Sequence, residues 1–173
     1  MKKLKSKFVY TKFRGINMEK NCIFCKIVAG QTEVEKIYED DLIIAFLDIS
    51  PINPGHILVI PKEHTASPSS LSEQISGRIF HVASRLGLAL KKALNADGVN
   101  LHLSDGICAG QTVAHTHLHV IPRYTDDAFH WNWRKLAHNE DNSELIDKIK
   151  SKLKLSINTN AMFQREPFSV TSN

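Results

Sequence analysis

The chain is poor in cysteine, has no long apolar segment, and lacks acidic side chains at one end. Three cysteines among 173 residues are too few for a disulfide-framed secreted protein, and they favour a reducing compartment. No stretch approaches the roughly 20 apolar residues that a membrane-spanning helix needs. The basic N-terminus has no apolar segment after its charges, which argues against a secretory signal peptide. We therefore expect a cytoplasmic protein without a membrane partner.

The formal net charge of +4 comes from one end of the chain. Residues 2–14 carry six Lys or Arg side chains and no acidic one, and subtracting these six from +4 leaves −2 for the rest. This near-neutral remainder gives no support to nucleic-acid binding, so no nucleic-acid partner is expected. We expect residues 1–20 to be a basic, disordered extension. The alternatives are an organelle transit peptide or an upstream start, with Met18 as the true beginning.

Three histidines alternate with other residues at His115, His117 and His119, just before Val120-Ile121-Pro122-Arg123. The period of two predicts a strand with all three imidazoles on one face, consecutive members being roughly 6–7 Å apart. Thr116, Leu118 and Val120 would then pack on the opposite face. This spacing suits groups that act around one phosphorus atom, or metal ligands. A His-rich strand without a function and an affinity tag are the alternatives, although a tag would be a terminal run.

A glycine-bracketed loop precedes the histidines. Gly106 and Gly110 let backbone amides approach an anion closely, while Gln111 and Thr112 add side-chain donors beside the imidazoles. This composition favours a phosphate-binding loop.

Two long motifs, in this order, resemble those of the histidine triad (HIT) family. The first is Asp48-Ile49-Ser50-Pro51 followed by Asn53-Pro54-Gly55-His56-Ile57-Leu58-Val59-Ile60-Pro61-Lys62, and the second runs from Ala109 to Arg123. The resemblance covers residues 21–125, which we expect to form the HIT domain. Residues 126–173 would be a C-terminal extension with an aromatic arm (Phe129, Trp131, Trp133) and one helix over 144–155.

Apolar spacing predicts an α+β fold, an antiparallel sheet of about five strands with one long helix, as the resemblance also implies. Ser72 is expected to cap the long helix over 73–95, with Gly98 beyond its end, and Asn21 to cap a short helix over 22–29. The expected strands are 34–39, 42–47, 56–60, 99–103 and the histidine segment.

The resemblance also implies roles for individual residues. His117 would attack the α-phosphorus of a nucleotide and form a nucleotidyl-histidine intermediate that water hydrolyses. His119 and Thr112 would contact the phosphate and help protonate the leaving group, and His56 would support the same site. Without the motif around it, His56 would be interpreted as a buried, hydrogen-bonded core histidine. Ser104 stands where the family commonly has Asn. Serine is shorter and offers one hydroxyl, which leaves the orientation of the phosphate there open.

Substrate recognition follows from the same resemblance. Asp48 would accept hydrogen bonds from two ribose hydroxyls, or else cap the turn before Pro51. The resemblance implies an apolar pocket for the base formed by Phe24, Ile27 and Phe46, although each of these could equally be plain core. It also implies phosphate contacts for the polar side chains of Ser104 and Gln111.

The spacing Cys22-x-x-Cys25 points two thiolates to one side, as half of a tetrahedral zinc site, although a redox pair or two core cysteines fit it too. By resemblance to zinc-binding members and relatives of the family, His64 and His115 would complete the site. Four protein ligands would make this Zn²⁺ structural and would remove His115 from catalysis.

The sequence thus predicts an enzyme that acts on a purine nucleotide, and by resemblance a homodimer. Two branches of the family remain open: a Hint-like one that cleaves adenosine phosphoramidates and a Fhit-like one that cleaves dinucleoside polyphosphates. A nucleotidylyltransferase is a third option, disfavoured because Thr116 stands where that group has a His-Pro-His form. The non-enzymatic alternative is a zinc-containing adaptor that binds nucleotides or RNA.

Overall fold

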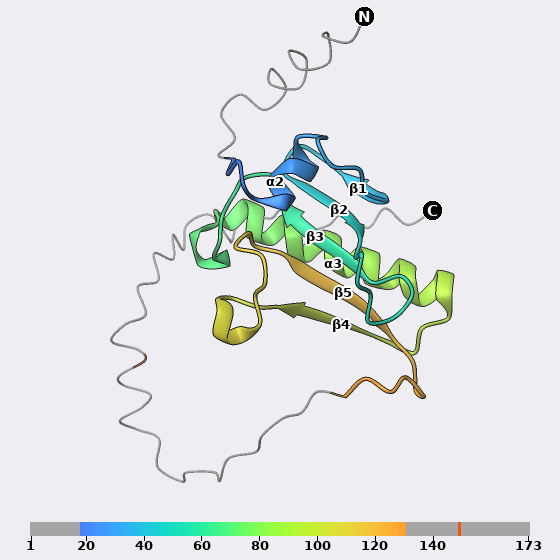
Figure 1. Ribbon diagram of the computed structural model, residues 1–173. Helices are drawn as coiled ribbons and strands as arrows, with labels where there is room; N and C mark the ends of the chain where they lie inside the picture. Colours follow the sequence, from blue (N-terminus) through green and yellow to red (C-terminus); the bar gives the residue numbers. More distant parts are fainter. Residues whose placement is uncertain (1–17, 131–148, 150–173) are drawn as a thin grey trace, which may run out of the picture. The chain divides into compact units, whose positions relative to one another are not determined.

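A five-stranded antiparallel sheet lies at the centre of the domain, in the order β1-β2-β3-β5-β4 (Figure 1). The computed structural model describes residues 18–130 and residue 149. The strands are β1 Lys36–Glu39, β2 Ile43–Leu47, β3 Ile57–Pro61, β4 Gly98–Leu103 and β5 Leu118–Arg123, and the helices are α2 Ile23–Val28 and α3 Glu73–Leu94, with single 3-10 turns at Pro68–Ser70 and Ile107–Ala109. Residues 1–17, Trp131, Trp133 and, apart from Ile149, the helix expected over 144–155 lie outside the described residues.

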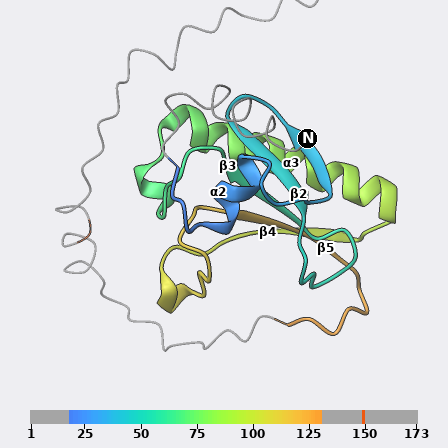
Figure 2. The ribbon, with the colours of Figure 1, turned by 45° about the horizontal axis from the view of Figure 1, so that its top comes forward.

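Helices cover both faces of the sheet (Figures 1 and 2). The apolar stripe of α3 packs on alternate residues of β2, β3 and β5, and α2 packs on the intervening residues of β2 and β3. The first cluster includes Ile75, Ile79, Val82, Ile43, Val59, Leu118 and Val120; the second includes Phe24, Ile27, Val28, Ile44, Phe46, Leu58 and Ile60. The expected α+β architecture is therefore confirmed.

The ends of the helices agree with the sequence only in part. Ser72 caps α3 as predicted, since its side chain accepts a hydrogen bond from the Ile75 N–H. The helix ends at Asn95, which adopts the left-handed conformation with φ of 53° three residues before Gly98. The Asn21 prediction was wrong, because Cys22 occupies the N-cap position of α2 and supplies no side-chain cap bond.

The strand predicted for all three histidines begins only at Leu118. His115 lies in a bend, and Thr116 is held by Thr65, whose carbonyl accepts from the Thr116 N–H at 2.6 Å and from its hydroxyl at 2.9 Å. The strand prediction was therefore wrong for His115 and His117. Leu118 and Val120 do pack beneath α3, on the face that the alternation assigned to them. Among the described residues, no helix has the length and apolar character to cross a bilayer.

Candidate active site and metal centre

The three predicted imidazoles follow one another along the face of the sheet that α2 covers. The ring centroids of His117 and His119 are 5.1 Å apart. The Phe24 ring of α2 makes edge contacts with both His115, at 5.7 Å, and His117, at 5.3 Å. A buried aromatic ring therefore lies against the first two histidines, while the third turns toward His56.

His117 has one ring nitrogen committed to the backbone. Its Nδ1 lies 2.7 Å from the carbonyl oxygen of His115. A carbonyl can only accept, so Nδ1 carries the proton and Nε2 of the neutral ring keeps its lone pair. His117 as a whole is 4% exposed. In its neutral form the predicted nucleophile therefore presents the Nε2 lone pair in a fixed orientation.

His56 and His119 form a hydrogen-bonded pair next to Asp48. His56 Nε2 lies 2.9 Å from His119 Nδ1, and Asp48 Oδ2 lies 3.6 Å and 3.8 Å from these two atoms. The Ile52 N–H donates to His56 Nδ1 at 3.2 Å. Because an N–H can only donate, His56 Nδ1 accepts, and its Nε2–H donates to His119 Nδ1. His119 Nε2 then carries a proton that it can donate in a hydrogen bond.

Both rings of this pair are neutral near pH 7. Burial is the largest cause that lowers the pKa of His119, to about 4, and neighbouring His117 and His56 act in the same direction while Asp48 opposes them. Burial also lowers the pKa of His56, again against the Asp48 carboxylate. The pair is therefore set to donate a hydrogen bond while uncharged.

Asp48 has a second contact, because its Oδ1 accepts from the Ser50 N–H at 2.9 Å. The turn-capping alternative is thus realised alongside the contact with the histidines. The two contacts use different oxygens, since Oδ1 caps the turn and Oδ2 lies beside the histidines. The ribose contact of Asp48 stays a prediction.

The oxygen and the nitrogen of the Gln111 side-chain amide both form hydrogen bonds with the backbone. Its Oε1 accepts from the Gly106 N–H at 2.7 Å, and its Nε2 donates to the Ala66 carbonyl at 2.8 Å. These bonds fix the shape of the glycine loop, and direct substrate contact by Gln111 stays a prediction. Thr112 lines a cavity of about 400 Å³ that Cys22 and His64 also line, and its phosphate contact is untested as well.

His102, which lies beside this group, belongs to no motif and was not among the predicted site residues. His102 pairs with His119 across β4 and β5, with ring centroids 5.9 Å apart. Its Nε2 lies 3.1 Å from the hydroxyl of the buried Ser104. The available signal was the spacing of two between His102 in β4 and Ser104, which directly follows the end of β4.

The side chains of Phe24, Ile27 and Phe46 lie together in the core cluster beneath α2. Each is less than 10% exposed, so the plain-core alternative accounts for their positions. Phe24 contacts the rings of His115 and His117, and a base pocket formed by the three stays a prediction.

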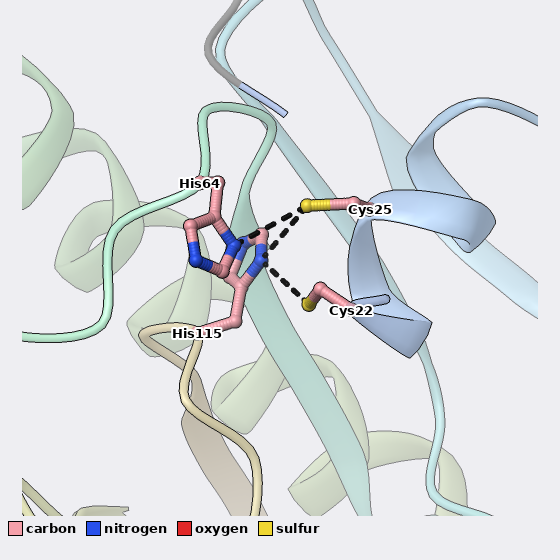
Figure 3. A group of neighbouring side chains, drawn as sticks. All are labelled: Cys22, Cys25, His64 and His115. Carbon is pink, nitrogen blue, oxygen red and sulfur yellow. Dashed lines mark hydrogen bonds between the residues drawn. The ribbon is translucent and has the colours of Figure 1, made fainter. Parts of the chain in front are cut away.

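Cys22, Cys25, His64 and His115 lie together, as the motifs predicted (Figure 3). His115 Nδ1 is 3.5 Å from Cys22 Sγ and 3.6 Å from Cys25 Sγ, and His64 Nδ1 is 3.3 Å from Cys25 Sγ. Tetrahedral zinc with bonds of about 2.3 Å to sulfur and about 2.05 Å to nitrogen places sulfur and nitrogen about 3.5 Å apart. The separations fit a tetrahedral metal ion.

The protonation of His115 also fits metal binding. Its Nε2 lies 2.9 Å from the Pro61 carbonyl oxygen, so Nε2 carries the proton and the Nδ1 lone pair faces the thiols. Burial is the main cause that raises the pKa of the Cys25 thiol to about 11, against the stabilising Glu19 N–H. A bound cation would favour the thiolate.

Asp48, His56 and His119 form a second group whose potential ligand atoms are close together. Here the backbone disfavours metal. A metal at His56 Nε2 would require the proton to move to Nδ1, where it would oppose the Ile52 N–H. The same reasoning that supports a metal at the cysteines therefore argues against one here.

Comparisons with known proteins agree with these observations. The profile of the family described as "HIT domain" matches residues 29–126. Protein hit of Bacillus subtilis is 38% identical over 77% of this chain and 94% of its own length, and Adenylylsulfatase HINT3 of Arabidopsis thaliana is 33% identical over 82% and 70%. The crystal structure of a HIT family member from Bacillus subtilis has a TM-score of 0.73 at 37% identity, covering 79% of this chain and all of that one. A Zn-bound histidine triad family protein from Mycobacterium smegmatis has a TM-score of 0.61 at 34% identity, covering 76% and 96%.

Proposed function

This chain belongs to the HIT domain family, and from that premise we propose that it cleaves the bond between a purine nucleoside 5′-phosphoryl group and a leaving group. The observation that carries the proposal is the Nδ1–H of His117 bonded to the His115 carbonyl, 2.7 Å away. It leaves a lone pair on Nε2 of a ring that is neighboured by a hydrogen-bond donor, His119.

In the proposed first step, His117 Nε2 forms a bond to the α-phosphorus, and the leaving group departs with the electron pair of its own bond to phosphorus. The imidazole becomes positively charged, which strengthens the hydrogen bond from Nδ1 to the His115 carbonyl. In the second step, a water oxygen bonds to phosphorus and the His117–phosphorus bond breaks. A basic leaving group takes a proton from solvent as it departs, and the attacking water returns a proton to solvent in the second step, so the protons balance. A sulfate leaving group takes no proton, and one proton is then released overall.

His119 would act on the departing atom. The negative charge on that atom grows as its bond to phosphorus breaks, and a donor aimed at it lowers the barrier. His56 keeps the His119 Nε2–H in place by donating to His119 Nδ1. Thr112, Ser104 and the glycine loop would bind the remaining phosphoryl oxygens. Asp48 Oδ2 would accept from the ribose, and Phe24, Ile27 and Phe46 would contact the base.

We further propose that Cys22, Cys25, His64 and His115 hold a structural Zn²⁺. The sulfur–nitrogen separations and the protonation of His115 support it, and the Zn-bound relative from Mycobacterium smegmatis is consistent with it. Four protein ligands leave no open position for substrate. The contribution of the metal would be to hold α2, the segment after β3 and the histidine segment together.

The test is to assay the purified full chain on adenosine phosphoramidate, adenosine 5′-phosphosulfate and diadenosine tetraphosphate side by side. The second substrate is included because a relative is named an adenylylsulfatase. His117→Ala should lower turnover by about three orders of magnitude or more at unchanged melting temperature. When a reaction with labelled substrate is quenched, the wild-type protein should carry an acid-labile, base-stable label, as expected for a phosphorus–nitrogen bond.

Near-normal turnover by His117→Ala would overturn the assignment of the nucleophile. Tight nucleotide binding without turnover, together with salt-sensitive RNA binding, would instead favour the zinc-containing adaptor. The ranking of the three substrates separates the Hint-like branch from the Fhit-like one.

A further inference from the structure

We infer that Asn53 and Asp127 are positioning residues that fix the tautomer of His56 and thereby keep the His119 Nε2–H available to the departing group. The side-chain hydrogen bonds of both residues go to groups other than the imidazoles. The inference rests on the proposed function for its catalytic consequence, but the tautomer itself is a property of the free protein.

The loop between β2 and β3 determines which nitrogen of His56 is protonated. Its two ends are joined by a hydrogen bond from the Asp48 N–H to the His56 carbonyl at 2.9 Å. Within the loop, the Ile52 N–H donates to His56 Nδ1 at 3.2 Å, and the His56 N–H donates to the Asn53 carbonyl at 3.1 Å. The position of Ile52 and Asn53 relative to β3 therefore decides the protonation of the ring.

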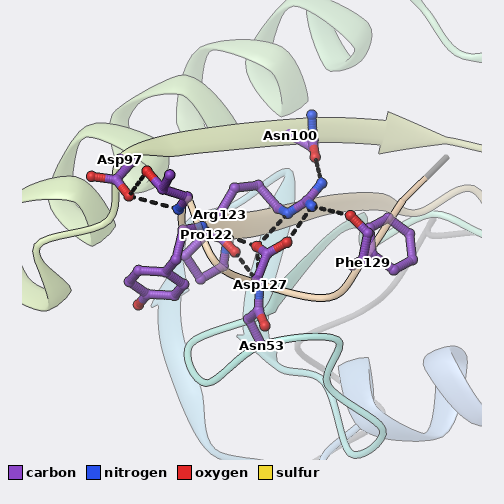
Figure 4. Close-up of polar contacts among 9 residues, drawn as sticks. Asn53, Asp97, Asn100, Pro122, Arg123, Asp127 and Phe129 are labelled. Atoms are coloured by element: carbon purple, nitrogen blue, oxygen red, sulfur yellow. Dashed lines mark hydrogen bonds and ion pairs between the residues drawn. The ribbon is translucent and has the colours of Figure 1, made fainter.

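Asn53 anchors this loop to the strand that carries His119. Its Nδ2 group donates both hydrogens, one to the Pro122 carbonyl at 2.8 Å and one to Asp127 Oδ2 at 2.9 Å (Figure 4). Pro122 belongs to β5, three residues after His119. The hydrogen bond from Asn53 to Pro122 therefore fixes the Ile52 N–H relative to β5, the strand that also carries the acceptor His119.

Asp127 is itself held rigidly. Arg123 Nε donates to its Oδ2 at 2.7 Å and Nη2 to its Oδ1, and the Tyr124 N–H donates to Oδ2 at 2.9 Å. Arg123 Nη1 in turn donates to Asn100 Oδ1 of β4 at 2.6 Å. The hydrogen bond from Arg123 is the largest cause that keeps the pKa of Asp127 well below its usual range. An ionised carboxylate therefore faces Asn53 at neutral pH.

The loop is also confined from the side of α3. Gly55 has a φ of 88°, and a Cβ on it would lie 2.5 Å from Leu94 Cδ1. The loop is thus hydrogen-bonded to β5 through Asn53 and packed against Leu94 of α3 through Gly55.

Loss of the Asn53 anchor has a specific consequence for the imidazole pair. If the Ile52 N–H moves away, His56 can place its proton on Nδ1 and present the Nε2 lone pair to His119. His119 must then carry its proton on Nδ1 to satisfy that contact, and its Nε2 ceases to be a donor. Substrates with a basic leaving group should suffer most, because they depend most on this donor.

The experiment uses the full chain with Asn53→Ala and Asp127→Asn. Asp97→Asn is the matched control, since Asp97 accepts from the backbone and hydroxyl of Thr125 in the same segment without contacting Asn53. One readout is the pair of ¹⁵N shifts of the His56 ring, assigned with His56→Gln. The other is kcat and KM on adenosine phosphoramidate, whose leaving group is basic, and on adenosine 5′-phosphosulfate, whose sulfate needs no proton.

The wild type and Asp97→Asn should show His56 protonated at Nε2, and both other variants should show a mixture of tautomers. The ratio of kcat on the phosphoramidate to kcat on the phosphosulfate should fall about tenfold in those two variants, with KM changed less. An unchanged His56 tautomer in both variants would overturn the inference, as would an equal loss of kcat on both substrates. If neither substrate is turned over by the wild type, the proposed function fails, and the ¹⁵N shifts still decide the positioning role. Asp127→Asn keeps the test decisive if Asn53→Ala does not fold.

Discussion

At the scale of single residues, backbone groups decide where three of the imidazoles carry their protons. The carbonyl of Pro61 selects Nε2 of His115, the carbonyl of His115 selects Nδ1 of His117, and the N–H of Ile52 excludes the proton from Nδ1 of His56. The consequences differ among the three rings. The lone pair of His115 faces the thiols, the lone pair of His117 lies on Nε2 of the predicted nucleophile, and the proton of His56 faces His119. One residue type would therefore supply the proposed metal ligand, the proposed nucleophile and a hydrogen-bond donor.

The lowered pKa of His119 predicts a loss of stability in acid. Its folded pKa of about 4 lies below the ordinary 6.5, so between these pH values the unfolded chain binds a proton that the folded protein does not. The free energy of unfolding should fall as pH decreases from 6.5 toward 4, and His119 should add no further loss below that. Denaturant unfolding at several pH values measures this, with His119→Asn expected to show a shallower dependence.

His81 provides the matched control for that experiment, because its side chain is exposed on α3. His81→Asn should keep the pH dependence of the wild type. Equal slopes for the wild type and His119→Asn would contradict the assigned pKa.

The sequence predicted which residues of the site gather but not how they are protonated. Cys22, Cys25, His64 and His115 come together as the motifs and the family resemblance implied. The selecting backbone groups could not be foreseen, since the Pro61 carbonyl that sets His115 lies 54 residues before it. His102 was overlooked because no motif contains it, and only the pairing of β4 with β5 brings it to His119.

At the scale of elements, the sequence predicted the regular parts well and the histidine segment poorly. The apolar stripe of α3 and the Ser72 cap are local signals, and both were confirmed. Alternation alone predicted a strand from His115 onward. The bonds from Thr116 to the Thr65 carbonyl and the position of His115 beside the cysteines instead bend the chain before Leu118. A distant contact overrode a local pattern.

Two glycines of α3 make a matched test of helix packing. A Cβ on Gly77 would meet nothing within 4 Å, whereas one on Gly87 would lie 3.2 Å from Val99 Cγ1 of β4. Gly77→Ala should raise the free energy of unfolding by about 0.5–1 kcal/mol, the usual preference of a helix for Ala. Gly87→Ala should gain clearly less or lose stability, because Val99 must shift. Urea unfolding checks both, and an equal gain at the two positions would show that close packing against β4 is unimportant.

At the scale of the whole molecule, the predicted homodimer would use the long helix α3 and a sheet edge. β4 is an edge strand of the sheet, and its six residues are all half-buried. α3 exposes Phe80 and Leu88. Unpaired strand edges and apolar side chains favour association with a second copy. Sedimentation velocity at micromolar concentration should show a dimer, and a monomer alone would contradict the prediction.

The proposed zinc site gives the other prediction at this scale, because its ligands come from three distant segments. Cys22 and Cys25 lie at the start of α2, His64 follows β3 and His115 precedes β5. A metal ion that joins them would contribute folding free energy. The double variant Cys22→Ser, Cys25→Ser should lose stoichiometric zinc by elemental analysis and melt about 10 °C earlier.

Turnover by the double variant should persist within about tenfold of the wild type, since the proposed nucleophile contacts phosphate and not metal. Cys108→Ser is the matched control, because Cys108 is exposed and lies outside the metal group. It should keep zinc, melting temperature and turnover. Wild-type protein purified without chelators and found to lack zinc would argue against the site. Zinc loss that abolishes turnover at an unchanged melting temperature would make the metal catalytic, and the histidine mechanism would then be wrong.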